Sequence, residues 1–361
     1  MPFDLSAPTR AARQKIDFYI AGIPPPAHAG GRIPVFYTDF DFFAQSLDNF
    51  AIYGIIVIER TNTVRYYSTW GHNIMKKKTV IDLYNMKKNG EKVSWITAYD
   101  APFASFAEQA GIDMVLVGDS MGMVDSGFDS TIPVTMDMCI EHCQSVRRGA
   151  PNTFVVGDMP FGSYQVSDEE AARNAIRFLK EGDVDAIKLE GGKSVASRIR
   201  AIRNCGILVF GHIGLTPQSS GVLGGHKAQG RTVESARAVI EDALAVEAAG
   251  ANFILVEAVP PEVTAEIHKL LSIPVYSIGA GAPCDGQLTI FADTIGMFQA
   301  FTPKFIKKYC EVAPIIVDAY KQYSAEIKNG TFPGEEHVYH VIDDPASFEA
   351  LFSEFDRKYK K

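Results

Sequence analysis

The sequence has little cysteine, no long run of like charge and no apolar run of membrane length. Its five cysteines among 361 residues include no Cys-x-x-Cys pair, which indicates reduced thiols in a cytoplasmic protein. The chain carries 35 basic and 43 acidic residues, a formal net charge of −8, and no basic block. We therefore predict no nucleic-acid and no membrane partner, and favour a small-molecule substrate.

Other features that the sequence lacks exclude further classes of protein. The apolar run over residues 51–58 is too short to span a bilayer and lies too far along the chain for a secretory signal. The chain contains no Walker pattern and no dinucleotide fingerprint. Hydrophobic residues make up 47% of the chain, so it can bury a large core, in one barrel-sized domain with an appendage or in two ordinary domains.

The first part of the chain differs from the rest. A proline triplet and a glycine pair interrupt it, and no functional motif appears before Met75, where Lys76–Lys78 and the pattern Thr79–Tyr84 resemble a new beginning. We predict an N-terminal extension of unknown role over residues 1–74, either an appended segment or an upstream extension of the reading frame. A (β/α)8 catalytic barrel is predicted over residues 75–345, and a C-terminal tail over residues 346–361.

From Val93 onward, short apolar runs alternate with helical patterns, which favours a parallel sheet covered by helices. Strands are predicted at residues 93–98, 114–117, 154–158, 186–190, 207–212, 253–257, 274–278 and, more weakly, 288–295. Eight strands joined mostly by helices or long connections fit a (β/α)8 TIM barrel better than an open doubly wound sheet. A helical region over residues 304–328 is predicted to pack on the barrel or on a neighbouring subunit.

Four of these predicted strands lead directly to an acid: Asp119, Asp158, Glu190 and Glu257. Because the carboxyl ends of barrel strands meet at one mouth, the four acids predict a single shared site. Any one of them could instead cap the helix that follows its strand. Their recurrence at equivalent positions favours function.

Carboxylates gathered in a barrel mouth repel one another and lose hydration, so a cation would stabilise them. Oxygen ligands without a cysteine pair suit Mg²⁺, and we predict Asp119, Asp158 and Glu190 as ligands, directly or through water. A 2-keto acid chelating this ion would have a more acidic neighbouring C–H bond. Glu257 follows an apolar run that would raise its pKa, which suits a general base, although it could also be a salt-bridged or capping acid.

Several further side chains have two interpretations. Lys188 would face the same side as Glu190 and could hold the substrate carboxylate or the enolate, although lone lysines are commonly surface charges. His212, at the end of another predicted strand, could belong to the site or be a structural hydrogen-bonding group. The glycine-rich connection over residues 217–231 has the length of an active-site cover.

A second group of residues offers an alternative metal site. Cys139, His142 and Cys143 could share a helix face and bind a metal ion, but ordinary helix packing is the favoured interpretation.

Eleven short pieces of the chain, each weak alone, form a recognisable set across about residues 75–340. They are residues 97–100 (TAYD), 117–122 (VGDSMG), 129–135 (DSTIPVT), 147–151 (RRGAP), 158–161 (DMPF), 188–192 (KLEGG), 211–218 (GHIGLTPQ), 256–260 (VEAVP), 279–281 (GAG), 285–287 (DGQ) and 333–337 (PGEEH). Together and in this order, they resemble the ketopantoate hydroxymethyltransferase family.

The resemblance implies a (β/α)8 barrel, usually a homodecamer. It implies transfer of a hydroxymethyl group from 5,10-methylenetetrahydrofolate to 3-methyl-2-oxobutanoate, giving 2-dehydropantoate, in the first step of pantothenate biosynthesis. The residues of this chain that match the family's functional positions are Asp119, Asp158 and Glu190 for magnesium, Asp119, Ser120, Asp158 and Lys188 for the keto acid, and Glu257 as proton acceptor.

The chain departs from the family pattern modestly. Ala258 stands after Glu257 where a cysteine is common, and His226 replaces a frequent tyrosine. Two other functions remain open: a lyase or mutase of the phosphoenolpyruvate mutase and isocitrate lyase type, and a catalytically silent barrel used for binding or assembly.

Overall fold

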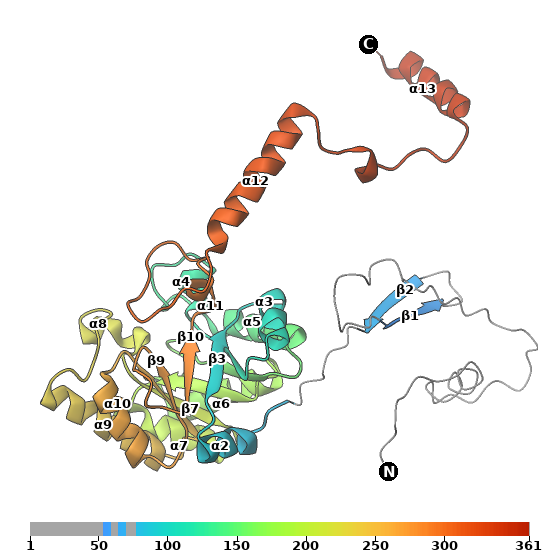
Figure 1. Cartoon of the computed structure of the whole chain (residues 1–361). Coiled ribbons are helices and arrows are strands. Elements are labelled where there is room, and N and C mark those ends of the chain that lie inside the picture. The colour runs from blue at the N-terminus through green and yellow to red at the C-terminus, as the bar shows by residue number, and fades with distance from the viewer. Residues whose placement is uncertain (1–52, 59–63, 70–76, 361) are drawn as a thin grey trace, which may run out of the picture. The chain divides into compact units, whose positions relative to one another are not determined.

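The computed structural model describes residues 53–58, 64–69 and 77–360 (Figure 1). The chain divides into two units after Gly71. In the first unit, β1 (Tyr53–Ile58) pairs antiparallel with β2 (Val64–Thr69). The rest of the predicted 1–74 extension lies outside the described residues, and its role stays a prediction.

In the second unit, eight parallel strands close into a barrel in the order β10-β3-β4-β5-β6-β7-β8-β9, which confirms the (β/α)8 prediction. The strands are β3 (Val93–Thr97), β4 (Met114–Val117), β5 (Phe154–Asp158), β6 (Ala186–Glu190), β7 (Val209–Gly214), β8 (Phe253–Glu257), β9 (Val275–Ile278) and β10 (Gly286–Thr289). Closure pairs each of these eight barrel strands on both sides.

The helices of this unit are α2 (Val80–Asn89), α3 (Ala101–Gln109), α4 (Met121–Val124), α5 (Met136–Gly149), α6 (Asp168–Lys180), α7 (Ala196–Asn204), α8 (Ser220–Leu223), α9 (Val233–Ala248), α10 (Pro261–Leu270), α11 (Phe291–Thr294), α12 (Val312–Asn329) and α13 (Pro345–Tyr359), with 3₁₀ turns η1 (Lys193–Val195), η2 (Pro217–Ser219) and η3 (Glu335–His337). Several begin at side-chain caps, as α2 does at the capping box of Thr79 and Asp82. Figure 1 shows α4 and α11 at one end of the barrel and α2 at the other.

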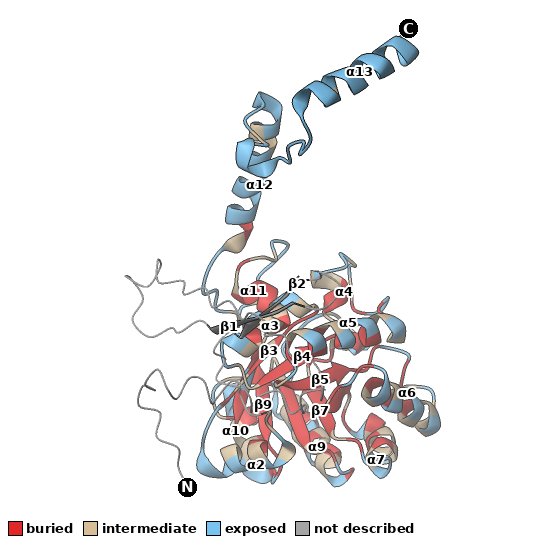
Figure 2. Cartoon of the chain, turned by 90° about the vertical axis from the view of Figure 1, so that its right-hand side faces the viewer, coloured by how far each residue is buried: buried red, intermediate tan, exposed pale blue. Residues whose placement is uncertain are grey.

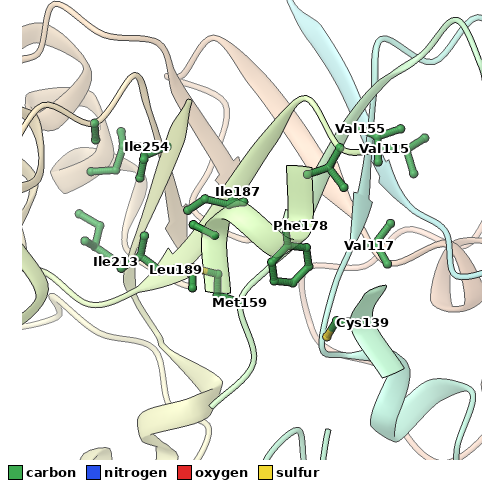
Figure 3. Packing of buried hydrophobic residues seen from close by; sticks show 14 of the residues in the cluster. Val115, Val117, Cys139, Val155, Met159, Phe178, Ile187, Leu189, Ile213 and Ile254 are labelled. Carbon is green, nitrogen blue, oxygen red and sulfur yellow. The ribbon is translucent and has the colours of Figure 1, made fainter. Parts of the chain in front are cut away.

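The core has two layers, because barrel strands bury both faces (Figure 2). Val115, Ile187 and Phe178 belong to the layer between strands and helices, shown in Figure 3. The second layer fills the barrel interior with aromatic rings, among which Phe210 stacks on Phe253 with ring centroids 4.3 Å apart. A filled interior leaves the mouth as the place for chemistry.

Three predicted elements differ from the structure by two residues or more at one end or both. The eighth strand ends at Thr289 rather than 295, because the chain leaves the ladder where Phe291 N–H donates to Thr97 Oγ1, and α11 follows. The fifth strand spans 209–214 rather than 207–212. The C-terminal helix begins at Val312 rather than at residue 304, since Pro314 is tolerated only in a first helical turn.

The C-terminal helices α12 and α13 bury little within this chain. Ala313 is the only buried residue of α12 and α13 has none, while Ile315, Tyr320 and Phe352 are exposed. Within the described residues, no helix combines the length and the hydropathy needed to cross a membrane.

Candidate active site

The predicted acids meet at the carboxyl end of the barrel. Asp158, Glu190 and Glu257 are the last residues of β5, β6 and β8, and Asp119 follows β4 by two residues. Asp119, Asp158 and Glu190 are 4%, 1% and 4% exposed. The sequence pattern therefore placed these side chains in one buried cluster correctly.

Lys188 is the cation of this cluster. Its Nζ lies 2.7 Å from Asp158 Oδ1, 3.6 Å from Glu190 Oε1 and 3.3 Å from His212 Nδ1. Burial alone would lower the pKa of Lys188, but the charges of the neighbouring acids outweigh burial and raise the pKa. Lys188 is therefore a buried ammonium at neutral pH, and its surface-charge interpretation is wrong.

Asp119 and Ser120 extend the cluster toward β4. The Asp119 N–H donates to Asp158 Oδ2 at 3.1 Å, which ties the end of β4 to the end of β5. Ser120 Oγ lies 2.8 Å from the hydroxyl of Tyr99, a residue that follows β3. The hydroxyl of Ser120 is thus held in a fixed place beside the acids.

The cluster holds more negative charge than Lys188 can neutralise. Burial raises the pKa of Asp119 to about 6, and that of Asp158 and of Glu190 to about 7. Mutual repulsion adds to the raised pKa of each acid, whereas Lys188 lowers it. A further cation, or a ligand that brings one, would stabilise the ionised cluster.

Glu257 stands apart from this cluster, beyond His212. His212 Nε2 lies 3.1 Å from Glu257 Oε2, and His212 Nδ1 lies 3.3 Å from Glu190 Oε1. Burial, followed by the charge of Lys188, lowers the pKa of His212, so the ring is neutral at pH 7. Burial raises the pKa of Glu257, although 14% of its side chain is exposed. A partly accessible acid of raised pKa suits a general base.

The backbone after Glu257 has an uncommon conformation. Ala258 adopts a φ of 48°, in the left-handed region that residues with a Cβ seldom occupy. Its N–H donates to Ile278 O, and its carbonyl accepts from Gln229 N–H. These two bonds fix the direction in which the chain leaves β8, and with it the position of the preceding acid.

Two residues that the sequence did not single out complete the cluster. Gln218 donates from Nε2 to Asp119 Oδ2 at 2.9 Å and from its backbone N–H to Glu190 Oε2 at 3.0 Å. The Tyr164 hydroxyl donates to Gln218 Oε1 at 2.6 Å and accepts from Glu190 N–H at 3.1 Å. Both residues lie in connections after strands, where the sequence shows no periodic signal.

The donor set fits Mg²⁺ in part. Asp158 Oδ1 is buried without a partner in ordinary hydrogen-bond geometry, although Lys188 Nζ lies close to it. No three His, Cys, Asp or Glu side chains in the described part of the chain are arranged as a ready metal cluster. Mg²⁺ commonly uses only one or two carboxylates, with waters and substrate oxygens as its other ligands, so the buried acids can serve it.

The Cys139, His142 and Cys143 group is used for packing. Both cysteines are fully buried in the layer between barrel and helices, and His142 Nδ1 lies 2.6 Å from Tyr99 O. None of the five cysteines, all within the described residues, is joined in a disulfide.

Comparison with known proteins identifies the family. The family model for ketopantoate hydroxymethyltransferase matches residues 77–335. This chain belongs to the ketopantoate hydroxymethyltransferase family. Within this family, the 3-methyl-2-oxobutanoate hydroxymethyltransferase of Alkaliphilus metalliredigens (strain QYMF) is 67% identical over 280 residues, covering 78% of this chain and 99% of the relative. That of Heliobacterium modesticaldum (strain ATCC 51547 / Ice1) is 50% identical over 269 residues, covering 74% and 98%.

Solved structures outside the family resemble this member only remotely. A phosphonopyruvate hydrolase is 12% identical with a TM-score of 0.48, over 78% of this chain and 99% of that chain. A 2,3-dimethylmalate lyase is 15% identical with a TM-score of 0.46, over 76% and 98%. Similarity at this level carries no information about the activity of this protein.

Proposed function

We propose that this protein transfers a hydroxymethyl group from 5,10-methylenetetrahydrofolate to 3-methyl-2-oxobutanoate, with uptake of one water, and so forms 2-dehydropantoate and tetrahydrofolate. Family membership supports the reaction class. The observation that carries the proposal is the division at the barrel mouth. Lys188 lies within ion-pair distance of Asp158 and Glu190, Asp119 is hydrogen-bonded to Asp158 through its N–H, and Glu257 stands apart beside His212.

The keto acid would bind at the cluster. Lys188 attracts its carboxylate, and the held hydroxyl of Ser120 donates to a substrate oxygen. Asp119, Asp158 and Glu190 would hold Mg²⁺, directly or through water. When bound there, Mg²⁺ would polarise the keto group and make the C3–H bond more acidic.

Glu257 would then remove the C3 proton. Burial raises its pKa and so makes it a stronger base when ionised, and the remaining exposure leaves room for the substrate. Because His212 rather than a cation is its neighbour, Glu257 is not neutralised by Lys188 directly. The carbon nucleophile left by proton removal would attack the methylene group of the folate donor.

Exchange of the C3 proton tests the base without the folate donor. Purified wild-type protein with Mg²⁺ is expected to exchange the C3–H of 3-methyl-2-oxobutanoate in D₂O, followed by NMR. Glu257→Gln is expected to lower this exchange by about 10²- to 10⁴-fold, the usual contribution of a general base, and to leave Mg²⁺ binding largely intact. Normal exchange in this variant would remove Glu257 from its assigned role.

A matched control is available on the next helix. Glu262, in the first turn of α10, is exposed, and Glu262→Gln should exchange like wild type. Turnover with and without methylenetetrahydrofolate separates a hydroxymethyl transferase from a lyase or mutase, which needs no folate. A wild-type protein that neither exchanges nor turns over the keto acid would favour the catalytically silent alternative.

The predicted homodecamer and cytoplasmic location stay predictions. The exposed apolar side chains of α12 and α13 support an oligomer, because apolar patches of this kind usually mark interaction surfaces. Size-exclusion chromatography with light scattering would measure the oligomeric state.

A further inference from the structure

Gln218 is the second residue of η2 and of the glycine-rich connection over residues 217–231. It is 5% exposed. Its amide nitrogen donates to Asp119 Oδ2 and to Met159 O, both at 2.9 Å. Its amide oxygen accepts from the Tyr164 hydroxyl at 2.6 Å and from Gln165 Nε2 at 3.3 Å. A glutamine amide has two N–H donors and two lone pairs on its oxygen, so this side chain is fully used.

The orientation of the Gln218 amide is dictated by its surroundings. One end faces a carboxylate oxygen and the Met159 carbonyl oxygen, both of which only accept hydrogen bonds. A reversed amide would place its own oxygen against these two acceptors and leave two buried donors misdirected. The group that holds Asp119 is therefore rigid and can adopt one arrangement.

Gln218 connects two acids that come from different strands. Its side chain holds Asp119 after β4, and its backbone N–H holds Glu190 at the end of β6 through Oε2 at 3.0 Å. Tyr164 reinforces this link, since its hydroxyl bonds both Gln218 Oε1 and the backbone N–H of Glu190. Gln218 and its tyrosine partner thus link the two carboxylates to each other.

The neutrality of glutamine matters for this role. A lysine or arginine in its place could also donate to Asp119 but would offset the negative charge that attracts a cation. The neutral amide orients the Asp119 carboxylate and leaves its negative charge to attract a cation. Groups of this kind, which orient ligands without touching the ion, commonly change metal affinity or activity by about 10- to 100-fold when removed.

We propose that Gln218 is a positioning residue that sets the placement of the Asp119 and Glu190 carboxylates and so presents them to the cation and the keto acid. This inference rests on the proposed function for its account of the reaction. Its structural part, the placement of two carboxylates for a divalent cation, is measurable without turnover.

The test compares Gln218→Met with wild type in the full chain. Methionine has a similar length but cannot donate to Asp119 or accept from Tyr164. Mn²⁺ affinity, measured by electron paramagnetic resonance, is expected to fall by about 10- to 100-fold, and C3–H exchange at saturating Mn²⁺ is expected to stay reduced. Gln229→Met is the matched control, because its amide lies in the same connection and donates to Lys227 O, away from the acids.

Unchanged Mn²⁺ affinity and exchange in folded Gln218→Met would overturn the inference. If that variant does not fold, Tyr164→Phe serves, since it removes the support of Gln218 but keeps both amide donors. This variant is expected to lose about 10-fold in Mn²⁺ affinity, the lower end of the same range, because the amide donors remain. Affinity equal to wild type would then overturn the inference. A wild-type protein that binds Mn²⁺ without exchange would refute the proposed function alone.

Discussion

Replacing Asp119 by asparagine is expected to stabilise the metal-free protein at pH 8 and to abolish its proposed activity. Asp119 is buried, and burial raises its pKa from 3.8 to about 6. Asparagine has the same shape, and its side-chain oxygen can still accept from Gln218 Nε2, which donates to Asp119 Oδ2 at 2.9 Å in the native chain. The substitution therefore removes a carboxylate that folding must strip of water.

The magnitude follows from the pKa shift. A difference of about 2 pKa units corresponds to about 3 kcal/mol, at 1.36 kcal/mol per unit. Because the folded-state pKa of Asp119 is the higher one, the unfolded chain ionises first, and stability is lost as pH rises from 3.8 through about 6. The new buried N–H group costs about 1 kcal/mol at every pH. The variant should thus be less stable than wild type near pH 4 and about 2 kcal/mol more stable at pH 8.

Urea unfolding in EDTA, at pH 4 and pH 8 and at fixed protein concentration, measures both values. Asp125→Asn is the control, since Asp125 is exposed at the end of α4 and its replacement should change little at either pH. An Asp119→Asn variant that is equally destabilised at both pH values would refute the reasoning. It would mean that Asp119 is already neutralised by its neighbours in the folded protein.

Two further predictions concern the barrel itself. Gly211→Ala would place a Cβ 2.3 Å from Val246 Cγ1 on α9, so we expect the free energy of unfolding in guanidinium to fall by about 1–3 kcal/mol. Adding Val246→Ala should restore part of this loss. An equal loss in the double variant would contradict the steric cause. Burial would raise the pKa of Asp285, but hydrogen bonds from Val275 N–H, His268 and Lys87 outweigh burial and lower the pKa. The stabilisation that ionised Asp285 gives the folded protein is present above pH 3.8 and is lost as pH falls. Asp285→Asn should therefore lower the free energy of unfolding at pH 7, and the difference from wild type should shrink below pH 4. A difference that stays constant with pH would contradict this account.

The convergence of the acids was predictable because its signal is local. An apolar run that closes on an acid is visible within six residues, and the geometry of parallel barrels turns equivalent positions into neighbours in space. Asp119, Asp158 and Glu190 were found in this way. The same rule placed Lys188 beside them, since residues two apart on a strand share a face.

Other parts of the site had no local signal. Gln218 lies 28 residues from Glu190 and 99 residues from Asp119, inside a connection with no periodic pattern. Tyr164 likewise acquires its role from tertiary contacts alone. At the end of the barrel, the apolar residues after Thr289 resemble a continuing strand, and only the long-range bond from Phe291 N–H to Thr97 shows that the chain turns away. Pro314 was a local signal for the start of α12 that the helical pattern around it obscured.

The aromatic interior of the barrel gives the protein an intrinsic optical probe. Trp95 on β3 is 2% exposed, lies 5.1 Å from the ring of Phe210, and has an indole N–H without a hydrogen-bond partner. The sequence contains one other tryptophan, Trp70, outside the described residues, so a Trp70→Phe chain would have a single emitter. Its short-wavelength fluorescence should move to longer wavelength only when the barrel opens. Since α12 and α13 contain no tryptophan, their unfolding would appear in circular dichroism and leave this emission unchanged.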